Sequence, residues 1–218
     1  MGIIIVGTNP YSLTLHKILQ KEGINVIAYS TYKEFISEKE IEGLPVVAFE
    51  DIDSLYKKDT YMLLNTIGYS KMNTIRSKVY YDIKYKKYPI FTFISKDAYV
   101  ISPELVGEGS IIMPMSYIGP FVKTGVCNII NPQCNLSHHI EMGDFNFIGR
   151  GTISGGSVKI GNHCFIGLHS TIKNKINIAD YTLIGAGSNV LKSTELYSVN
   201  VGNPARQLID KNSLETKI

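Results

Sequence analysis

The chain carries a repeat of six residues along most of its second half. Residues 109 to 192 divide into fourteen consecutive hexads without an insertion, beginning GSIIMP, MSYIGP and FVKTGV. The fourth residue of each hexad is aliphatic except at Thr124 and Ser154. A period of six fits neither a helix, with 3.6 residues per turn, nor an alternating strand, and it is the signature of a parallel β-helix. We therefore expect three hexads to form each triangular coil, with the fourth positions stacked inside the prism.

The first hundred residues follow a different pattern, in which apolar strands alternate with helical segments. Strands are predicted at 2–7, 24–30, 44–49, 61–68 and 89–95, and helices at 11–21 and about 70–84. This alternation is typical of a small parallel α/β domain of Rossmann-like type. The predicted domains are 1–98 for the α/β domain, 99–200 for the β-helix, and 201–218 for a C-terminal tail that caps the prism.

Composition excludes few functions. The formal net charge of +3 is too small to indicate nucleic-acid binding, although a basic, tyrosine-rich run occupies residues 80–89. We interpret that run as a solvated helix end, with an anion site as the alternative. Cys127, Cys134 and Cys164 lack metal-ligand spacing and are interpreted as packing residues of a reduced, cytoplasmic protein. The apolar N-terminal run is too short for a signal or a membrane span, so no membrane insertion is expected.

The α/β domain, the hexads and a VGNPAR segment at 201–206 follow one another in this order. In this respect the chain resembles the hexapeptide-repeat sugar acyltransferases, which include sialic acid O-acetyltransferases and nucleotide-4-amino-sugar N-acetyltransferases. The resemblance implies a left-handed β-helix and a homotrimer with active sites between neighbouring prisms. It also implies a cytoplasmic enzyme that uses acetyl-CoA as acyl donor, without a metal, to acetylate a nucleotide-linked amino sugar for surface glycans.

The resemblance places the general base at His138. The family's histidine lies in a short stretch that matches residues 137–143 here, and a neutral imidazole is a natural base near pH 7. His139, the second catalytic candidate, stands where the family carries an acidic residue that orients the base. It can hydrogen-bond the first imidazole but cannot stabilise an imidazolium as a carboxylate would. By the eighteen-residue register Gly156 lies one coil away, and we expect it to leave space for a thioester.

Matching positions also suggest where the cofactor runs. The pantetheine is expected to pass Gly156, Leu168 and Ala186, and the CoA phosphates to meet Lys192 and Arg206 by charge. Three further residues receive structural interpretations: Arg150 as a solvated turn residue, with a substrate or cofactor contact as the alternative, and His163 and His169 as surface or interface residues.

For the sugar nucleotide, the turn after the first strand takes the place of the family's glycine-rich phosphate-binding turn. Here it begins Gly7-Thr8-Asn9, and Pro10 at the helix start removes one amide donor. Gly68 and Arg76 match the family's Ile-Gly…Arg segment. The predicted substrate-binding residues are therefore Gly7, Thr8, Asn9, Gly68 and Arg76.

Three alternatives stay open. An O-acetyltransferase of sialic acid or a related sugar would use the same base. A non-catalytic trimeric scaffold is consistent with the missing acidic partner of His138. A γ-type carbonic anhydrase would need three histidines meeting across a subunit interface, but the α/β domain and the tail argue against it.

Overall fold

The computed structural model describes residues 1–217, which form two compact units. The α/β unit comprises Met1–Gly68 and Lys78–Phe91, and the β-helix unit comprises Tyr69–Ser77 and the chain from Thr92 onward. This division departs from the predicted boundary after residue 98. The first strand of the β-helix already lies at Phe93–Ile94, because these residues pair with the next coil rather than with the α/β sheet.

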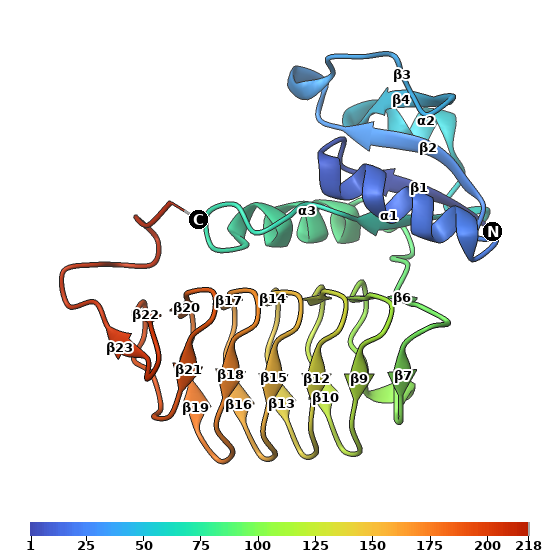
Figure 1. Ribbon diagram of the computed structural model, residues 1–218. Coiled ribbons are helices and arrows are strands. Elements are labelled where there is room, and N and C mark those ends of the chain that lie inside the picture. The colour runs from blue at the N-terminus through green and yellow to red at the C-terminus, as the bar shows by residue number, and fades with distance from the viewer. Residues whose placement is uncertain (218) are drawn as a thin grey trace. The chain divides into compact units, whose positions relative to one another are not determined.

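The α/β unit is built on a five-stranded sheet of order β3-β4-β2-β1-β5, parallel except for β3. Figure 1 labels its first four strands. Its strands are β1 (Gly2–Val6), β2 (Val26–Thr31), β3 (Glu40–Ile41), β4 (Leu44–Ala48) and β5 (Tyr61–Asn65). Its helices are α1 (Pro10–Lys21), α2 (Ile52–Leu55), most of α3 (Thr74–Tyr85), and the 3-10 turns η1 (Lys33–Phe35) and η2 (Phe49–Asp51). The predicted alternation of strands and helices is confirmed. The predicted strand at 89–95 is wrong, since only Ile90 bridges to β5, at Leu63.

Local sequence explains how this unit starts. All of β1 is buried, as its unbroken aliphatic run requires of a central parallel strand. Helix α1 begins with Pro10 at its first turn and with Asn9 as N-cap, whose side chain accepts a hydrogen bond from the Ser12 amide. Leu15 and Leu19 then fall on the buried face of the helix.

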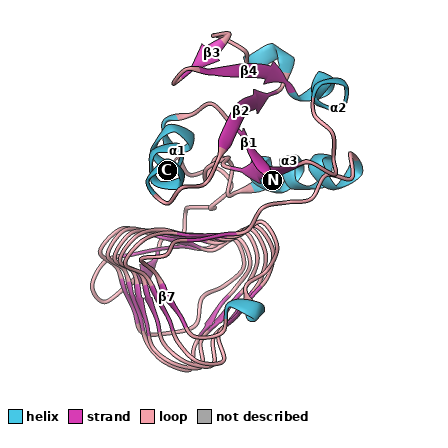
Figure 2. Cartoon of the chain, turned by 90° about the vertical axis from the view of Figure 1, so that its right-hand side faces the viewer, coloured by secondary structure: helices cyan, strands magenta, loops and turns pink. Residues whose placement is uncertain are grey.

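The β-helix unit is a triangular prism, seen end-on in Figure 2. Its eight-stranded face contains β6 (Phe93–Ile94), β8 (Ile111–Ile112), β11 (Ile129–Ile130), β14 (Phe147–Ile148), β17 (Phe165–Ile166), β20 (Leu183–Ile184), β22 (Val199–Val201) and β23 (Arg206–Gln207). Its six-stranded face contains β7 (Tyr99–Val100), β9 (Tyr117–Ile118), β12 (Asn135–Leu136), β15 (Ile153–Ser154), β18 (Thr171–Ile172) and β21 (Asn189–Val190). Its four-stranded face contains β10 (Lys123–Thr124), β13 (Glu141–Met142), β16 (Lys159–Ile160) and β19 (Asn177–Ile178), and η3 (Pro103–Leu105) belongs to an early coil.

The predicted register of the hexads is confirmed. Ile130 pairs with Ile148 and Ile148 with Ile166, so that equivalent residues of successive coils stack in parallel ladders. The fourth positions are buried inside the prism except Thr124, which is half-buried, and Ser154 is accommodated among the aliphatic residues. Because the second residue of each short strand points inward and the first points outward, a slip of one residue would turn the whole core outward. All three cysteines are free and buried, in agreement with their interpretation as packing residues.

The prism ends at its C-terminal side in an antiparallel strand. β22 continues the parallel stacking on β20, and β23 from the tail then pairs antiparallel with β22. A change of direction of this kind interrupts further stacking of parallel coils. No helix among residues 1–217 is long and apolar enough to cross a membrane.

Candidate active site

His138 and His139 lie at the corner that joins the six-stranded and four-stranded faces, between β12 and β13. Both side chains are exposed, and their Nδ1 atoms lie 3.0 Å apart, within hydrogen-bond distance. His139 adopts the left-handed backbone conformation that the corner requires, with a φ of 53°. Its ring packs on Phe121 of the preceding coil, with 4.6 Å between ring centroids. The predicted contact between the two imidazoles is therefore present.

The contact between the two rings constrains their protonation. One Nδ1 must donate and the other must accept, because a neutral imidazole has one of each. If His138 donates from Nδ1, its Nε2 carries the lone pair and can accept a proton from a substrate. In the opposite arrangement Nε2 of His138 carries the hydrogen and cannot act as a base. His139 can thus orient the base through its tautomer, although it supplies no negative charge.

Gly156 lies directly against the imidazole of His138. A Cβ atom added at Gly156 would lie 2.3 Å from Cε1 and 2.5 Å from Nε2 of that ring. The space that the sequence suggested for a thioester is therefore occupied by the base itself. Gly156 is needed because any side chain there would displace His138 from its position.

The other predicted cofactor residues lie on two different edges. Leu168 and Ala186 are exposed at the corner between the eight-stranded and six-stranded faces, one above the other. Arg150 belongs to the same column, since its carbonyl accepts from the amide of the following coil at His169. Lys192 is exposed on the His138 edge, after β21, whereas Arg206 is exposed on β23. Within one chain, the structure does not bring Leu168 and Ala186 to His138, because the six-stranded face separates the two corners.

The predicted substrate residues of the α/β unit do come together. β1 and β5 are neighbours in the sheet, so the Gly7-Thr8-Asn9 turn lies beside the segment that follows β5. The Asn9 side chain donates to the carbonyl of Thr66 at 3.3 Å. Gly7 has a φ of 132°, and a Cβ there would lie 2.7 Å from the Thr66 hydroxyl. Gly68 stands two residues beyond Thr66, where a Cβ would meet no other atom within 4 Å.

Two amide donors around this turn are used inside the protein. The Gly7 amide donates to the carbonyl of Ser30, and the Ser12 amide donates to the side chain of Asn9. Pro10 has no amide hydrogen at all. A phosphate at the start of α1 would therefore find fewer donors than an open glycine-rich turn provides.

Arg76 does not belong with these residues. Its side chain is fully buried, and its guanidinium donates to the main-chain carbonyls of Cys127, Phe145 and Asn146 at 2.7 to 3.0 Å. These carbonyls lie at a corner of the prism. These contacts give Arg76 a structural role within the β-helix unit, and the substrate contact stays a prediction.

A column of stacked rings was not predicted from the sequence. Phe145, His163, Tyr181 and Tyr197 stack along one corner, with ring centroids 4.7 to 5.2 Å apart. Burial lowers the pKa of His163, so its ring stays neutral near pH 7. His163 is half-buried in this column, and its interpretation as a surface or interface residue stays a prediction. The eighteen-residue spacing of Phe145, His163 and Tyr181 is the signal that could have indicated the column. Across residues 1–217, no three His, Cys, Asp or Glu side chains of the chain converge to hold a metal.

Known structures provide the comparison with other proteins, since no protein-family model and no curated protein matches the chain. The acetyltransferase domain of PglB from Neisseria gonorrhoeae FA1090, in complex with acetyl coenzyme A, is 18% identical, with a TM-score of 0.85 over 95% of this chain and 98% of that chain. PerB from Caulobacter crescentus, in complex with CoA and GDP-perosamine, is 22% identical, with a TM-score of 0.82 over 95% and 97%. WeeI from Acinetobacter baumannii AYE is 21% identical, with a TM-score of 0.83 over 95% and 100%.

These similarities extend over both units of the chain. They confirm the predicted fold, which is a Rossmann-like α/β unit followed by a left-handed parallel β-helix of hexapeptide repeats.

Proposed function

We propose that the protein is an acetyl-CoA-dependent acetyltransferase that acetylates the amino group of a nucleotide-linked amino sugar. The observation that carries the proposal is the position of the exposed His138. Its ring contacts His139 through Nδ1 and lies against Gly156, in a fold that the chain shares with an acetyltransferase domain. The similarity to PerB, whose structure contains CoA and GDP-perosamine, supports the class of both substrates. A cytoplasmic location is part of the same proposal.

In the proposed reaction the amine of the sugar attacks the thioester carbon of acetyl-CoA. Nε2 of His138 accepts the proton that the amine loses as the new carbon–nitrogen bond forms. The carbon–sulfur bond then breaks, and the CoA thiolate leaves and takes up a proton. No covalent enzyme intermediate is needed, which agrees with the burial of all three cysteines. Pantetheine is proposed to pass Gly156, Leu168 and Ala186, with Lys192 and Arg206 toward the CoA phosphates.

The direct test is release of CoA thiol from acetyl-CoA with a panel of amino-sugar nucleotides. We expect turnover with at least one amine acceptor, and mass spectrometry should detect a product heavier by one acetyl group. Turnover only with hydroxyl acceptors such as sialic acid would replace N-acetylation by O-acetylation. No turnover with either class, from a folded protein, would favour a non-catalytic scaffold.

We also propose a homotrimer in which the six-stranded face points toward the threefold axis. Part of the eight-stranded face is covered within its own unit, since Tyr69 packs on Phe147 and Phe165, each at 5.0 Å between ring centroids. The four-stranded face carries charged side chains along its strands. The six-stranded face exposes apolar side chains between the polar Asn135 and Thr171, with Tyr99 and Ile153 68% and 51% exposed. Exposed apolar surface of this kind usually marks an interface.

In a cyclic trimer each contact joins two different edges of neighbouring copies. The His138 edge of one copy would then meet the edge that carries Leu168 and Ala186 in the next copy. This arrangement supports the proposed cofactor residues, because the two groups lie on opposite edges of the same face within one chain.

The substitution Ile153→Asp is expected to convert the trimer into monomers. It would place a carboxylate in the centre of the proposed interface, where burial of an unpaired charge is strongly unfavourable. Light scattering coupled to size-exclusion chromatography measures the mass. The matched control is Asn177→Asp, which adds the same charge to the exposed four-stranded face. A trimer that survives Ile153→Asp but not Asn177→Asp would assign the interface to the wrong face.

The substitution Gly156→Ala is expected to lower kcat by about 10- to 100-fold without unfolding the protein. The added methyl group would lie 2.3 Å from the His138 ring, and the ring can turn away because its side chain is exposed. The melting temperature and the oligomer mass serve as controls. Unchanged kcat in this variant would mean that the observed position of His138 is not the reactive one.

A further inference from the structure

A cavity of about 620 Å³ lies in the α/β unit, between α2, the C-terminal half of α3 and the residues that follow β2 and β4. Its volume is typical of sites for small organic ligands. The walls combine three lysines with three aromatic rings: Lys58, Lys86, Lys87, Tyr32, Phe49 and Tyr85. The function proposed above uses none of these residues. The cavity includes the end of the basic, tyrosine-rich run at 80–89.

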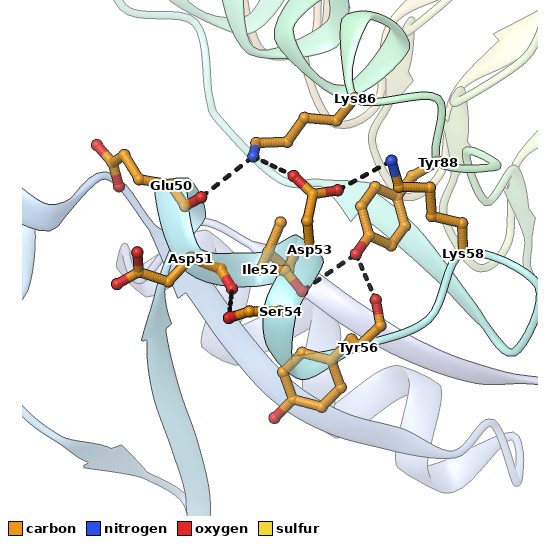
Figure 3. A network of polar contacts seen from close by, with 9 residues as sticks. All are labelled: Glu50, Asp51, Ile52, Asp53, Ser54, Tyr56, Lys58, Lys86 and Tyr88. Atoms are coloured by element: carbon orange, nitrogen blue, oxygen red, sulfur yellow. Dashed lines mark hydrogen bonds and ion pairs between the residues drawn. The ribbon is translucent and has the colours of Figure 1, made fainter.

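Two of the three lysines share one carboxylate. Asp53 accepts from Lys86 at 2.5 Å and forms an ion pair with Lys58 at 3.0 Å (Figure 3). Lys86 also donates to the carbonyl of Glu50 at 3.2 Å. The hydrogen bond from Lys86 lowers the pKa of Asp53, so this carboxyl is ionised at neutral pH. One negative charge therefore faces two ammonium groups, which leaves a net positive charge at this wall of the cavity.

The second carboxylate of the cavity does not cancel that charge. Asp82 is paired with Lys78 at 2.8 Å, and it accepts a hydrogen bond from the hydroxyl of Tyr32. Lys78 does not line the cavity. Asp82 is thus neutralised from outside, and the excess of positive charge inside the cavity remains.

The third lysine occupies an unusual backbone position. Lys87 follows α3 with a φ of 61°. The helix ends there with hydrogen bonds from the Lys87 amide to the Lys84 carbonyl and from the Tyr88 amide to the Ile83 carbonyl. This is a Schellman motif, in which the left-handed residue is usually glycine. Lys87 is exposed, and its ammonium has no hydrogen-bond or ion-pair partner within residues 1–217. A strained residue with a free charge at the rim of a cavity suggests a role for that charge in binding.

The aromatic residues provide surfaces for a planar ring. Phe49 is buried and meets Tyr32 edge-on, at 5.5 Å between centroids, and the Lys86 ammonium lies 5.4 Å from the Phe49 centroid. Tyr85 is 88% exposed at the rim, where a ligand ring can stack on it. Ammonium groups next to aromatic surfaces match the two parts of a nucleotide, its phosphates and its base.

We infer that this cavity binds the nucleoside diphosphate part of the substrate, with Lys58, Lys86 and Lys87 toward the phosphates and the aromatic residues toward the base. The inference rests on the proposed function, which supplies a nucleotide-linked substrate. It also explains how the chain binds such a substrate although Gly7, Pro10 and Ser12 offer no free amide at the start of α1.

Calorimetric titration of the full chain with UDP and with GDP tests the inference. Lys87→Gly is the sharpest variant, because glycine suits the left-handed position and only the charged side chain is lost. We expect Lys87→Gly to bind the preferred nucleotide about tenfold more weakly, or worse, as loss of a charge-assisted contact to phosphate requires. Its melting temperature should be equal to or above that of the wild type. Lys58→Met should weaken binding similarly, and the matched control Lys57→Ala should leave binding unchanged.

Inorganic pyrophosphate separates a nucleotide site from a general anion site. Binding of pyrophosphate as tight as that of the nucleotides would overturn the role of the aromatic residues. Wild-type affinity in both Lys87→Gly and Lys58→Met would overturn the inference as a whole, even if the enzyme transfers acetyl groups as proposed. Conversely, nucleotide binding that depends on Lys58 and Lys87, in a protein that acetylates no acceptor, would support the cavity and refute the proposed function. In an active enzyme, both variants should raise KM for the sugar nucleotide and leave kcat unchanged.

Discussion

Replacing His138 by alanine is expected to lower kcat for acetyl transfer by about 10²- to 10⁴-fold, the usual contribution of a general base. The amine must lose a proton while it attacks the thioester, and Nε2 of His138 is the acceptor proposed for it. Nδ1 of the same ring already faces Nδ1 of His139 at 3.0 Å, so only Nε2 is open to the substrate. KM for acetyl-CoA should change little, because the imidazole is not proposed to bind the nucleotide part of CoA. Initial rates of thiol release measure both parameters.

His139→Ala is the matched control for this result. The variant removes the adjacent imidazole, which is also exposed, but His138 keeps its ring and loses only the partner that selects its tautomer. Its kcat should therefore fall less than that of His138→Ala. Near wild-type turnover in His138→Ala together with loss of activity in His139→Ala would exchange the two roles. Unimpaired turnover in both variants would place the base elsewhere. Melting temperatures should stay within a few degrees of wild type, because neither side chain is buried.

The β-helix can be predicted from the sequence because its information is local and repeated. In every hexad the fourth residue points inward. The eighteen-residue spacing is therefore enough to place Ile130, Ile148 and Ile166 in one ladder. The same register places Gly156 beside His138, and Leu168 in one column with Ala186. The register does not determine the rotamer of a side chain at a corner. His138 itself fills the space over Gly156, and a repeat of six residues contains no information about that.

The predictions that fail do so because of tertiary contacts. The run 89–95 has the composition of one strand, yet Ile90 bridges to β5 while Phe93 and Ile94 pair with β8 of the prism. Local propensity cannot divide a strand between two sheets. The lysine-lined cavity is equally hidden in the sequence, since Lys58 and Lys86 are far apart along the chain and meet only through Asp53. The basic run at 80–89 can be recognised in the sequence. The sequence does not indicate that Asp53 and Lys58 lie opposite this run in the fold.

Arg76 gives the second large effect that we expect, on stability rather than on catalysis. Arg76→Met should reduce the free energy of unfolding by about 3 kcal/mol or more, since a hydrogen bond from a charged group contributes about 1.5–3 kcal/mol and three of them would be lost. The carbonyls of Cys127, Phe145 and Asn146 would each lose a hydrogen bond from the guanidinium, and all three residues are buried. The Asn146 carbonyl would keep its bond from the Ile129 amide. Methionine fills a similar volume, so the loss would come from the missing charged hydrogen bonds more than from an empty space. Thermal melting should show a decrease of roughly 6 to 12 °C for this loss, at 2–4 °C per kcal/mol.

Two further variants separate this structural role from a substrate contact. Arg76→Lys keeps the positive charge, but a single ammonium cannot reach the three carbonyls that the planar guanidinium spans, so its stability should remain clearly below wild type. Arg150→Ala removes an exposed arginine and should leave the melting temperature unchanged. If Arg76→Met melted like wild type but showed a raised KM for the sugar nucleotide, Arg76 would be a substrate residue, as the resemblance to the acyltransferases suggested. The buried guanidinium donates to three main-chain carbonyls of the prism, and we therefore expect the opposite pattern. Arg76→Met should lose stability, and the fraction that stays folded should keep the wild-type KM for the sugar nucleotide.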